Sequence, residues 1–159
     1  MFSLFDKKPK LNNTANQDLS RMLFDNPHDP VCNEEFFHDK VMDFSLESLM
    51  IIDDYLESLR AELPEGDGLI KVGLRAGSYL GEVIRKQSTI KYNWLVYEEA
   101  IKVNPNIEEF GLSLGTYSIL WAKPDNFVFP LAKVLKRLEN GAEDSVYLFA
   151  KVAIAGLPE

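Results

Sequence analysis

The side chains best suited to metal binding or nucleophilic catalysis lie in one short N-terminal segment. His28, Cys32 and His38 are the only histidines and the only cysteine of the chain. Their spacing differs from the C-x2-C and H-x3-H pairs that are common in zinc sites. A cysteine nucleophile would need a histidine base held by a third group, and a segment rich in Asn and Pro does not hold side chains in place. We therefore expect no metal site, no cofactor and no catalytic residue.

Paired carboxylates are the other arrangement that could support acid–base chemistry. Asp53 and Asp54 are adjacent, so on a helix their side chains point about 100° apart and do not converge. Glu82 falls opposite the apolar side of its expected helix, four residues before Lys86, a spacing typical of surface ion pairs. We expect Glu82 to be a solvated or ion-paired carboxylate, and we expect the protein to act without catalysis.

Composition limits the class of protein that carries these side chains. The chain has 159 residues, of which 17 are basic and 25 acidic, for a net charge of −8. This length indicates one domain, and the acidic charge argues against binding to nucleic acid. No apolar run approaches the ~18 residues of a membrane span. One cysteine excludes an intrachain disulfide, and the N-terminus lacks the charge order of an export signal, so we expect a cytoplasmic protein.

The chain is expected to divide into an irregular N-terminal tail, residues 1–40, and a single α+β domain, residues 41–159. The tail is rich in Asn and Pro, which favour turns. Within it, only residues 17–24 have the hydrophobic spacing of a short helical turn. We interpret this segment as a mostly irregular tail that can fold across the domain.

Hydrophobic spacing predicts two helices at the start of the domain. The first begins near Ser45, a residue type that caps helices, and ends before Pro64. The second covers residues 69–86 and carries a glycine every four residues. Glycine costs roughly 1 kcal/mol of helix stability against alanine, so this repeat indicates that another backbone packs closely there. The glycines are Gly73, Gly77 and Gly81.

Two segments rich in aromatic and β-branched residues, 92–97 and 117–122, follow and are typical of strands. No helix long enough for a parallel crossover separates them, so we expect a small antiparallel sheet. Residues 100–103 either extend the first strand or form another. Two C-terminal helices complete the domain, one beginning at Pro130 and one covering residues 144–155. The predicted fold is α+β: two N-terminal helices, a small antiparallel sheet and two C-terminal helices.

Parts of this pattern carry a family resemblance. They are Gly77-Ser78-Tyr79-Leu80-Gly81-Glu82-Val83-Ile84 on a helix, Trp94 on a strand, and Pro130 with Lys136-Arg137 and Gly141. These residues resemble a group of small bacterial domains of unknown function, which share a G-x-Y-x-G-E-V-like helix, a tryptophan strand and a K-R-x-x-x-G helix end. The similarity covers about residues 45–155. It implies a soluble cytoplasmic protein and carries over no catalytic residue.

Charge is distributed unevenly along the chain. Residues 34–67 contain eleven acids and two bases, a local net charge of −9, and the rest of the chain has a net charge of +1. On the first predicted helix, four acids lie away from the apolar stripe, with a methionine among them. Such charges speed encounter with a basic partner, and the methionine supplies a desolvated centre. The predicted partner-binding residues are Glu47, Met50, Asp53, Asp54 and Glu57.

These observations favour a protein-interaction module of a bacterial type that binds a basic protein through an acidic helix, for example an immunity or inhibitor protein. The alternative is a small-molecule binding protein or enzyme with a pocket in the aromatic sheet region, lined by Trp94, Tyr97, Tyr117 and Trp121. A third interpretation is a homo-oligomer. The last helix is apolar nearly all round, so it needs cover from its own domain or from a second copy.

Overall fold

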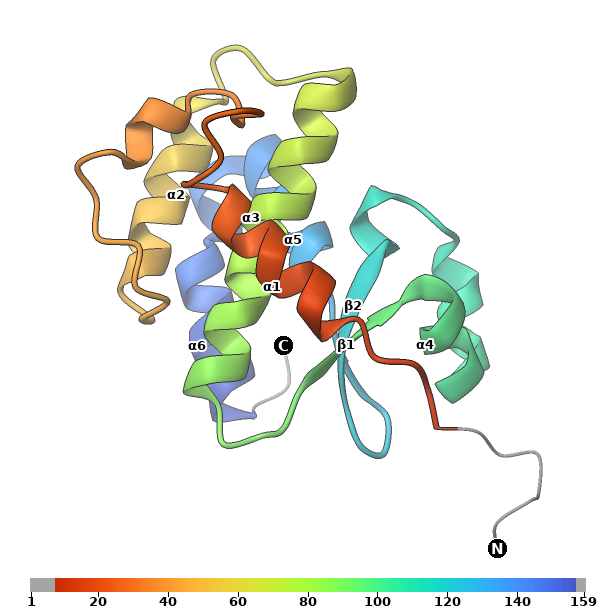
Figure 1. Ribbon diagram of the computed structural model, residues 1–159. Coiled ribbons are helices and arrows are strands. Elements are labelled where there is room, and N and C mark those ends of the chain that lie inside the picture. The colour runs from red at the N-terminus through yellow and green to blue at the C-terminus, as the bar shows by residue number, and fades with distance from the viewer. Residues whose placement is uncertain (1–7, 157–159) are drawn as a thin grey trace, which may run out of the picture.

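Helices make up most of the protein, and a short antiparallel sheet lies to one side of them (Figure 1). The computed structural model describes residues 8–156, so the outer ends of the predicted tail and domain lie outside the described residues. The combination of helices with a three-stranded antiparallel sheet confirms the predicted α+β class.

The α-helices are α1 (Asn13–Met22), α2 (Ser48–Ser58), α3 (Gly66–Gln87), α4 (Tyr97–Val103), α5 (Pro130–Asn140) and α6 (Val146–Ala155). The strands are β1 (Asn93–Val96), β2 (Ser118–Ala122) and β3 (Asn126–Val128). Short 3-10 helices are η1 (Glu34–Phe37), η2 (Pro105–Phe110), η3 (Leu114–Thr116) and η4 (Gly141–Asp144).

The long helix α3 contacts α1, α5 and α6, and its glycines determine how closely its neighbours approach. A Cβ atom on Gly77 would lie 2.8 Å from the Cα of Leu131 on α5. A Cβ atom on Gly81 would overlap the indole ring of Trp94 on β1. The close approach of another backbone, predicted from the glycine repeat, is found at Gly77 only, whereas the side chains of Leu114 and Trp94 take the space beside Gly73 and Gly81.

The N-terminal segment differs most from its prediction. Helix α1 lies across α3 (Figure 1), and its buried Asn16 donates from Nδ2 to Ser78 Oγ at 3.0 Å. Farther along the chain, Leu23, Val31 and Phe37 lie in the same hydrophobic core as α2 and α3. The described part of the tail thus folds across the domain, as the sequence analysis allowed, but it contains α1 and η1 where mostly irregular structure was expected. Outside residues 17–24 its apolar residues show no helical period, yet Leu23, Val31 and Phe37 are all buried in the core.

The starts of α2 and α5 and the end of α5 can be compared with the residues expected at helix ends. Helix α2 begins at Ser48, three residues after the expected start, and its N-cap is Glu47, whose side chain makes no capping hydrogen bond. Ser45 lies in the turn before the helix, where its hydroxyl accepts a hydrogen bond from the Ser48 amide at 3.2 Å. Pro130 is the first residue of α5, as predicted, because its missing N–H and fixed φ suit the first turn of a helix. Gly141 follows α5 with a φ of 83°, a conformation that favours glycine.

The sheet has the strand order β1-β2-β3, and both pairs are antiparallel, as predicted for the first two strands. Trp94 on β1 lies opposite Leu120 on β2, and both belong to the main core beneath the helices. Leu95 and Ile119 alternate with them and belong to a smaller core that includes residues of α4. The sheet therefore separates two hydrophobic cores.

Two elements of the sheet region were not predicted. Residues 100–103, expected to extend the first strand or to form another, lie in α4, and residues 126–128 form β3, a strand that the sequence analysis does not predict. Glu98 and Glu99 occupy the first turn of α4, where the helix dipole favours acids. The two acids at the start of the segment therefore indicate its helical structure, whereas its β-branched residues suggested a strand.

Candidate functional site

The acidic residues predicted to bind a partner take two different positions on α2. Glu47, Met50 and Asp54 are exposed along one side of the helix, and 48% of the Met50 surface is accessible. Among residues 8–156, neither Glu47 nor Asp54 forms an ion pair. These three residues, with the half-exposed Glu57, form the acidic stripe.

Asp53 points away from the acidic stripe and into the junction of α2, α5 and α6, which corrects the expectation that it lies on the exposed side. Its carboxylate accepts hydrogen bonds from Arg137 Nε at 3.1 Å and Ser145 Oγ at 2.7 Å. It also accepts from the amides of Val146 at 2.9 Å and Tyr147 at 3.2 Å. Amides in the first turn of a helix have no partner within the helix. Asp53 therefore caps α6 and joins it to Arg137 on α5.

Glu57 is shared between the surface and the interior. Its Oε1 accepts from Arg137 Nη1 at 2.9 Å, and its Oε2 lies 3.2 Å from Arg60 Nη1. The hydrogen bond from Arg137 is the main cause that lowers the pKa of Glu57, and the charges of Arg60 and Arg137 act in the same direction. Since Arg137 is almost fully buried, Glu57 holds α5 to α2 as well as contributing charge to the acidic stripe.

The four aromatic residues predicted to line a pocket lie in separate places. Trp94 is fully buried in the main core, and Trp121 belongs to the smaller core on the other face of the sheet. Tyr97 packs at the edge of the smaller core, whereas Tyr117 is exposed. Trp121 also donates from Nε1 to the carbonyl oxygen of Pro124 at 3.2 Å. These positions suit packing and do not bring the four rings to one cavity.

Glu82 is buried rather than on the surface, which corrects its expected position. Its residue surface is 1% exposed, and its Oε2 accepts from Trp94 Nε1 at 2.9 Å and from Arg85 Nη1 at 2.8 Å. The helical wheel places Glu82 opposite the apolar stripe of α3 correctly. It cannot show that α1 and the Trp94 side chain of β1 cover that second side of the helix.

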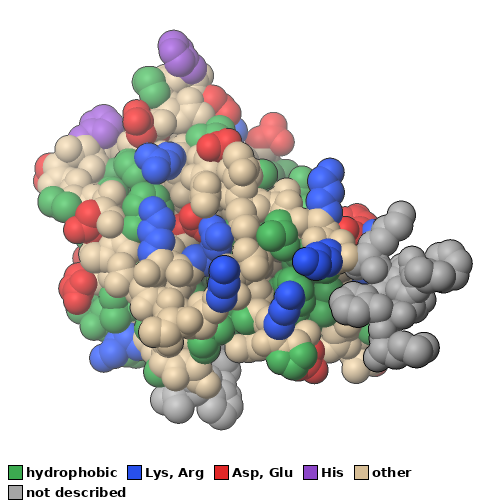
Figure 2. Space-filling model, turned by 60° about the horizontal axis from the view of Figure 1, so that its bottom comes forward, with side chains coloured by type: hydrophobic (Ala, Val, Ile, Leu, Met, Phe, Trp, Pro, Cys, Tyr) green, Lys and Arg blue, Asp and Glu red, His purple; other side chains and the backbone are tan. Residues whose placement is uncertain are grey.

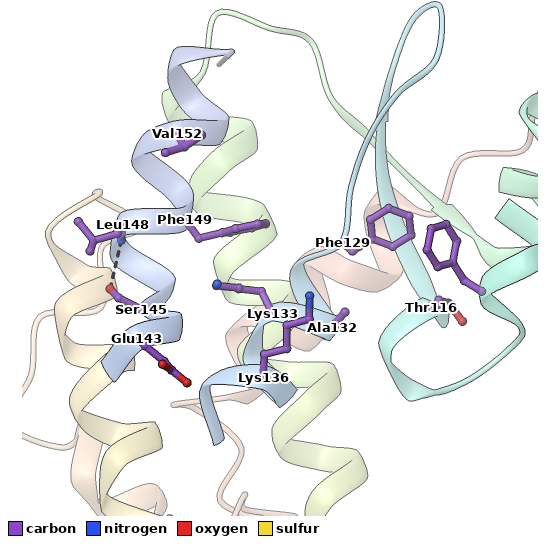
Figure 3. A pocket seen from close by; sticks show the side chains of 11 residues that line it. Thr116, Phe129, Ala132, Lys133, Lys136, Glu143, Ser145, Leu148, Phe149 and Val152 are labelled. Carbon is purple, nitrogen blue, oxygen red and sulfur yellow. Dashed lines mark hydrogen bonds between the residues drawn. The ribbon is translucent and has the colours of Figure 1, made fainter. Parts of the chain in front are cut away.

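A hollow of about 620 Å³ lies between α5 and α6, beside the sheet region, and was not predicted (Figure 3). Figure 3 shows Phe149 and Phe129 on opposite sides of it, with Lys133 and Lys136 between them and Glu143 at the end away from both rings. Exposed Phe110 and Leu148 also line this α5–α6 hollow. The sequence signal at this place is Phe129 followed by Lys133 and Lys136 on the next predicted helix.

The walls of the α5–α6 hollow are fixed by local contacts. The Phe110 and Phe129 rings lie 5.4 Å apart, and Thr116 Oγ1 donates to the carbonyl oxygen of Gly111 at 2.7 Å, which closes the turn after Phe110. On the other wall, Ser145 Oγ accepts from the Leu148 amide at 3.2 Å and caps α6 (Figure 3). The hollow is therefore part of the folded domain rather than a gap between loose segments.

The lysines of the α5–α6 hollow differ in their partners. Lys133 Nζ lies 2.7 Å from Asp144 Oδ1 and 5.5 Å from the centroid of the Phe149 ring. Lys136 is exposed and forms no ion pair with any residue between 8 and 156. The hydrogen bond from Lys133 is the main cause that lowers the pKa of Asp144. Lys136 is thus the cation whose charge no direct ion pair compensates.

Residues 111–115 match the G-x-S-x-G pattern of serine hydrolases, which the sequence-based prediction overlooked. The nucleophile elbow of those enzymes is a strained turn between a strand and a helix. Here Ser113 has an extended backbone, with φ of −151° and ψ of 179°, and the chain continues into η3 and then β2. The Ser113 hydroxyl lies 3.4 Å from Thr116 Oγ1. The match is therefore a turn that supports the hollow, not an elbow.

The segment with the metal-binding residue types does not form a cluster. His28 and His38 are exposed, Cys32 is half-buried, and the Cys32 carbonyl accepts from the Tyr55 hydroxyl at 2.7 Å. In the part of the chain that the structure describes, no three of the His, Cys, Asp and Glu side chains lie close enough together to hold a metal ion.

Lysine and arginine side chains gather on the face shown in Figure 2, and acidic side chains lie toward its edges. At the C-terminal end of α3, Arg85, Lys86 and Lys91 line a shallow polar hollow of about 420 Å³. The charges of the folded protein are therefore separated, with a basic region at this end of α3 and the acidic stripe on α2.

The apolar last helix, α6, is covered in large part by its own chain. It buries Val146, Ala150 and Ala153 and contacts α2 and α3, and it leaves Leu148 58% exposed. Among residues 8–156, no helix combines the length and the hydropathy needed to cross a bilayer.

Comparison of the chain with known protein families, with curated proteins and with solved structures found no match.

Proposed function

We propose that the protein is an interaction module that binds a basic protein partner through the acidic stripe on α2. The observation that carries this proposal is the exposure of Met50 between Glu47 and Asp54, two carboxylates without an ion-pair partner among the described residues. An apolar centre flanked by uncompensated charge suits such a contact. The charges speed encounter, and the centre is desolvated on binding.

The buried side of α2 supports this proposal because it holds the helix in a fixed position. Ile52 and Leu56 are fully buried, and the Tyr55 hydroxyl donates to the Cys32 carbonyl oxygen at 2.7 Å. Asp53 and Glu57 both bind Arg137 on α5. A binding surface that is already ordered loses little conformational entropy on association, so more of its contact energy contributes to affinity.

The kind of partner follows from the charge. The eleven acids of residues 34–67 produce a field that attracts cationic surfaces. A small acidic inhibitor or immunity protein that covers a basic enzyme would use such a field for fast capture. The proposal is one of binding without catalysis, in the cytoplasm.

The test compares two doubly neutralised variants. Glu47→Gln with Asp54→Asn removes two charges from the acidic stripe and leaves Glu57 in place, because Glu57 is one of the two carboxylates that pair with the buried Arg137. Glu108→Gln with Glu109→Gln removes the same charge from exposed positions in η2. A partner captured from a lysate at low salt is identified and purified, and its association rate is then measured as a function of salt concentration.

We expect a basic partner whose association rate falls steeply with salt. The stripe variant should associate several-fold more slowly with a weaker salt dependence, and the η2 variant should resemble the wild type. An acidic partner, or a basic partner that associates equally fast with the stripe variant, would contradict the proposal. Met50→Ala tests the apolar centre separately and should mainly raise the dissociation rate.

A further inference from the structure

The α5–α6 hollow combines aromatic walls with a lysine that lacks a direct ion-pair partner. Its volume of about 620 Å³ lies within the range of roughly 300–1,000 Å³ that small-molecule sites occupy. Such sites are mostly apolar and contain a few polar groups that orient the ligand. Here Phe129 and Phe149 face each other across the hollow, and Lys136 lies between them (Figure 3).

We propose that the α5–α6 hollow binds an organic anion with a flat apolar body and one carboxylate group. The apolar body lies between Phe149 and Phe129, and the carboxylate binds Lys136. This site is separate from the acidic stripe on α2, so the proposal does not depend on the proposed protein partner.

The charges around the hollow favour an anion over a cation. Lys133 is already neutralised by Asp144 at 2.7 Å, which leaves Lys136 as the cation near the rings. The acid of the lining, Glu143, lies at the end of the hollow away from both rings (Figure 3). A ligand body placed between the rings therefore brings its charged group to Lys136 and keeps it away from Glu143.

Exposed apolar side chains at the rim support the same ligand class. Phe110 is 67% exposed although its ring lies only 5.4 Å from the Phe129 ring, and Leu148 is exposed on the opposite wall. A flat apolar ligand would cover part of both side chains and so remove apolar surface from water. A small inorganic anion would leave this surface exposed, so the apolar body is part of the recognition.

The test uses three probes with the same bicyclic ring and different charge on the intact chain. They are 2-naphthoate, the neutral 2-naphthalenemethanol and the cationic 2-naphthylmethylammonium, titrated with fluorescence or amide chemical shifts as the readout. We expect 2-naphthoate to bind about tenfold more tightly than the cation, since a charged hydrogen bond contributes enough to change a binding constant by this factor. The shifts should centre on α5, α6 and residues 110–116.

Three variants make the assignment specific. Lys136→Gln should weaken 2-naphthoate about tenfold and leave the neutral probe unchanged, because only the charge is removed. Lys86→Gln is the control with the same change of charge, since Lys86 is exposed on another part of the surface, over the Phe44 ring at 4.1 Å. Glu143→Gln should strengthen 2-naphthoate slightly, because it removes the remaining acid of the lining.

Ala132→Trp provides a steric test, because Ala132 lies on the floor of the hollow and a tryptophan there would fill it. This variant should lose binding of all three probes while its circular dichroism stays unchanged. If it does not fold, Lys136→Gln and Glu143→Gln still decide the question. Absence of saturable binding of 2-naphthoate, equal affinity for the cation, or unchanged affinity in Lys136→Gln would each overturn the proposal.

Discussion

Trp94 on β1 donates its indole Nε1–H to Glu82 Oε2 on α3 at 2.9 Å, and the same oxygen accepts from Arg85 at 2.8 Å. The ring lies in the space that Gly81 leaves open by lacking a Cβ atom. Gly81, Glu82 and Trp94 therefore form one contact between helix and sheet. Gly81, Glu82 and Trp94 are all buried, so this contact joins α3 to β1 within the fold.

Removal of the Glu82 carboxylate should destabilise the protein strongly. Glu82→Ala leaves the indole N–H and the Arg85 guanidinium without their acceptor, and such losses typically cost about 2–4 kcal/mol. Urea denaturation followed by circular dichroism measures the change. Glu108→Ala, at an exposed position in η2, is the control and should change the free energy of unfolding by no more than about 0.5 kcal/mol. Equal stabilities of the two variants would show that the buried contact contributes nothing.

Gly81 should tolerate no side chain. In Gly81→Ala the new methyl group would overlap the Trp94 ring, so helix and strand must separate, at a cost of about 1–3 kcal/mol or more. Gly68→Ala lies on the same helix, where the nearest atom to the new methyl group is Pro64 Cβ at 3.7 Å. That variant should gain up to about 1 kcal/mol from alanine's higher helix propensity. Thermal unfolding of both variants checks the opposite signs, and a stabilised Gly81→Ala would contradict the packing described.

The sequence predicts those elements whose stabilising signals are local. Helix α5 follows from Pro130 and a regular apolar spacing, and β1 and β2 follow from aromatic and β-branched residues. Helix α1 is predicted only in part, as a short turn over residues 17–24, because its start depends on a distant contact: Asn16 is buried and donates a hydrogen bond to Ser78, 62 residues away. The same limit applies to the candidate sites. The exposed positions of Glu47 and Met50 follow from the helical period of α2, but the α5–α6 hollow depends on how three separate segments meet.

Asp53 and its neighbour Asp54 test how much a contact that the sequence does not predict contributes to stability. Both are acids on α2, yet only Asp53 binds Arg137, Ser145 and the first amides of α6. Asp53→Asn places an amide N–H₂ group among donors, and we expect a loss of about 2–4 kcal/mol. Asp54→Asn should stay within about 0.5 kcal/mol of the wild type. The two variants have the same net charge, so equal effects in urea denaturation would show that charge, rather than capping of α6, determines stability.

Stability should fall in acid, partly because of Asp144. The hydrogen bond from Lys133 is the main cause that holds the pKa of Asp144 below its ordinary value of 3.8 in the folded protein, and Asn140 and the charges of Lys133 and Lys136 act in the same direction. The unfolded chain then binds the proton more readily, so stability rises with pH in this range. The contribution of Asp144 is complete above its unfolded pKa and is lost as pH falls through the lower folded pKa. Glu57, lowered by Arg137, acts with the same sign.

Lys133→Met isolates the contribution of Asp144. Without the lysine, the folded pKa of Asp144 should return toward 3.8, so the decrease of the unfolding free energy below about pH 4 should become shallower than in the wild type. Lys151→Met is the matched control, because Lys151 lies over the Tyr147 ring at 5.5 Å and forms no ion pair within residues 8–156. Urea denaturation between about pH 2.5 and 7 measures the two curves, and carboxyl NMR titration follows Asp144 directly. If the free energy of unfolding decreases equally steeply below about pH 4 in both variants, the Lys133–Asp144 pair does not couple folding to pH.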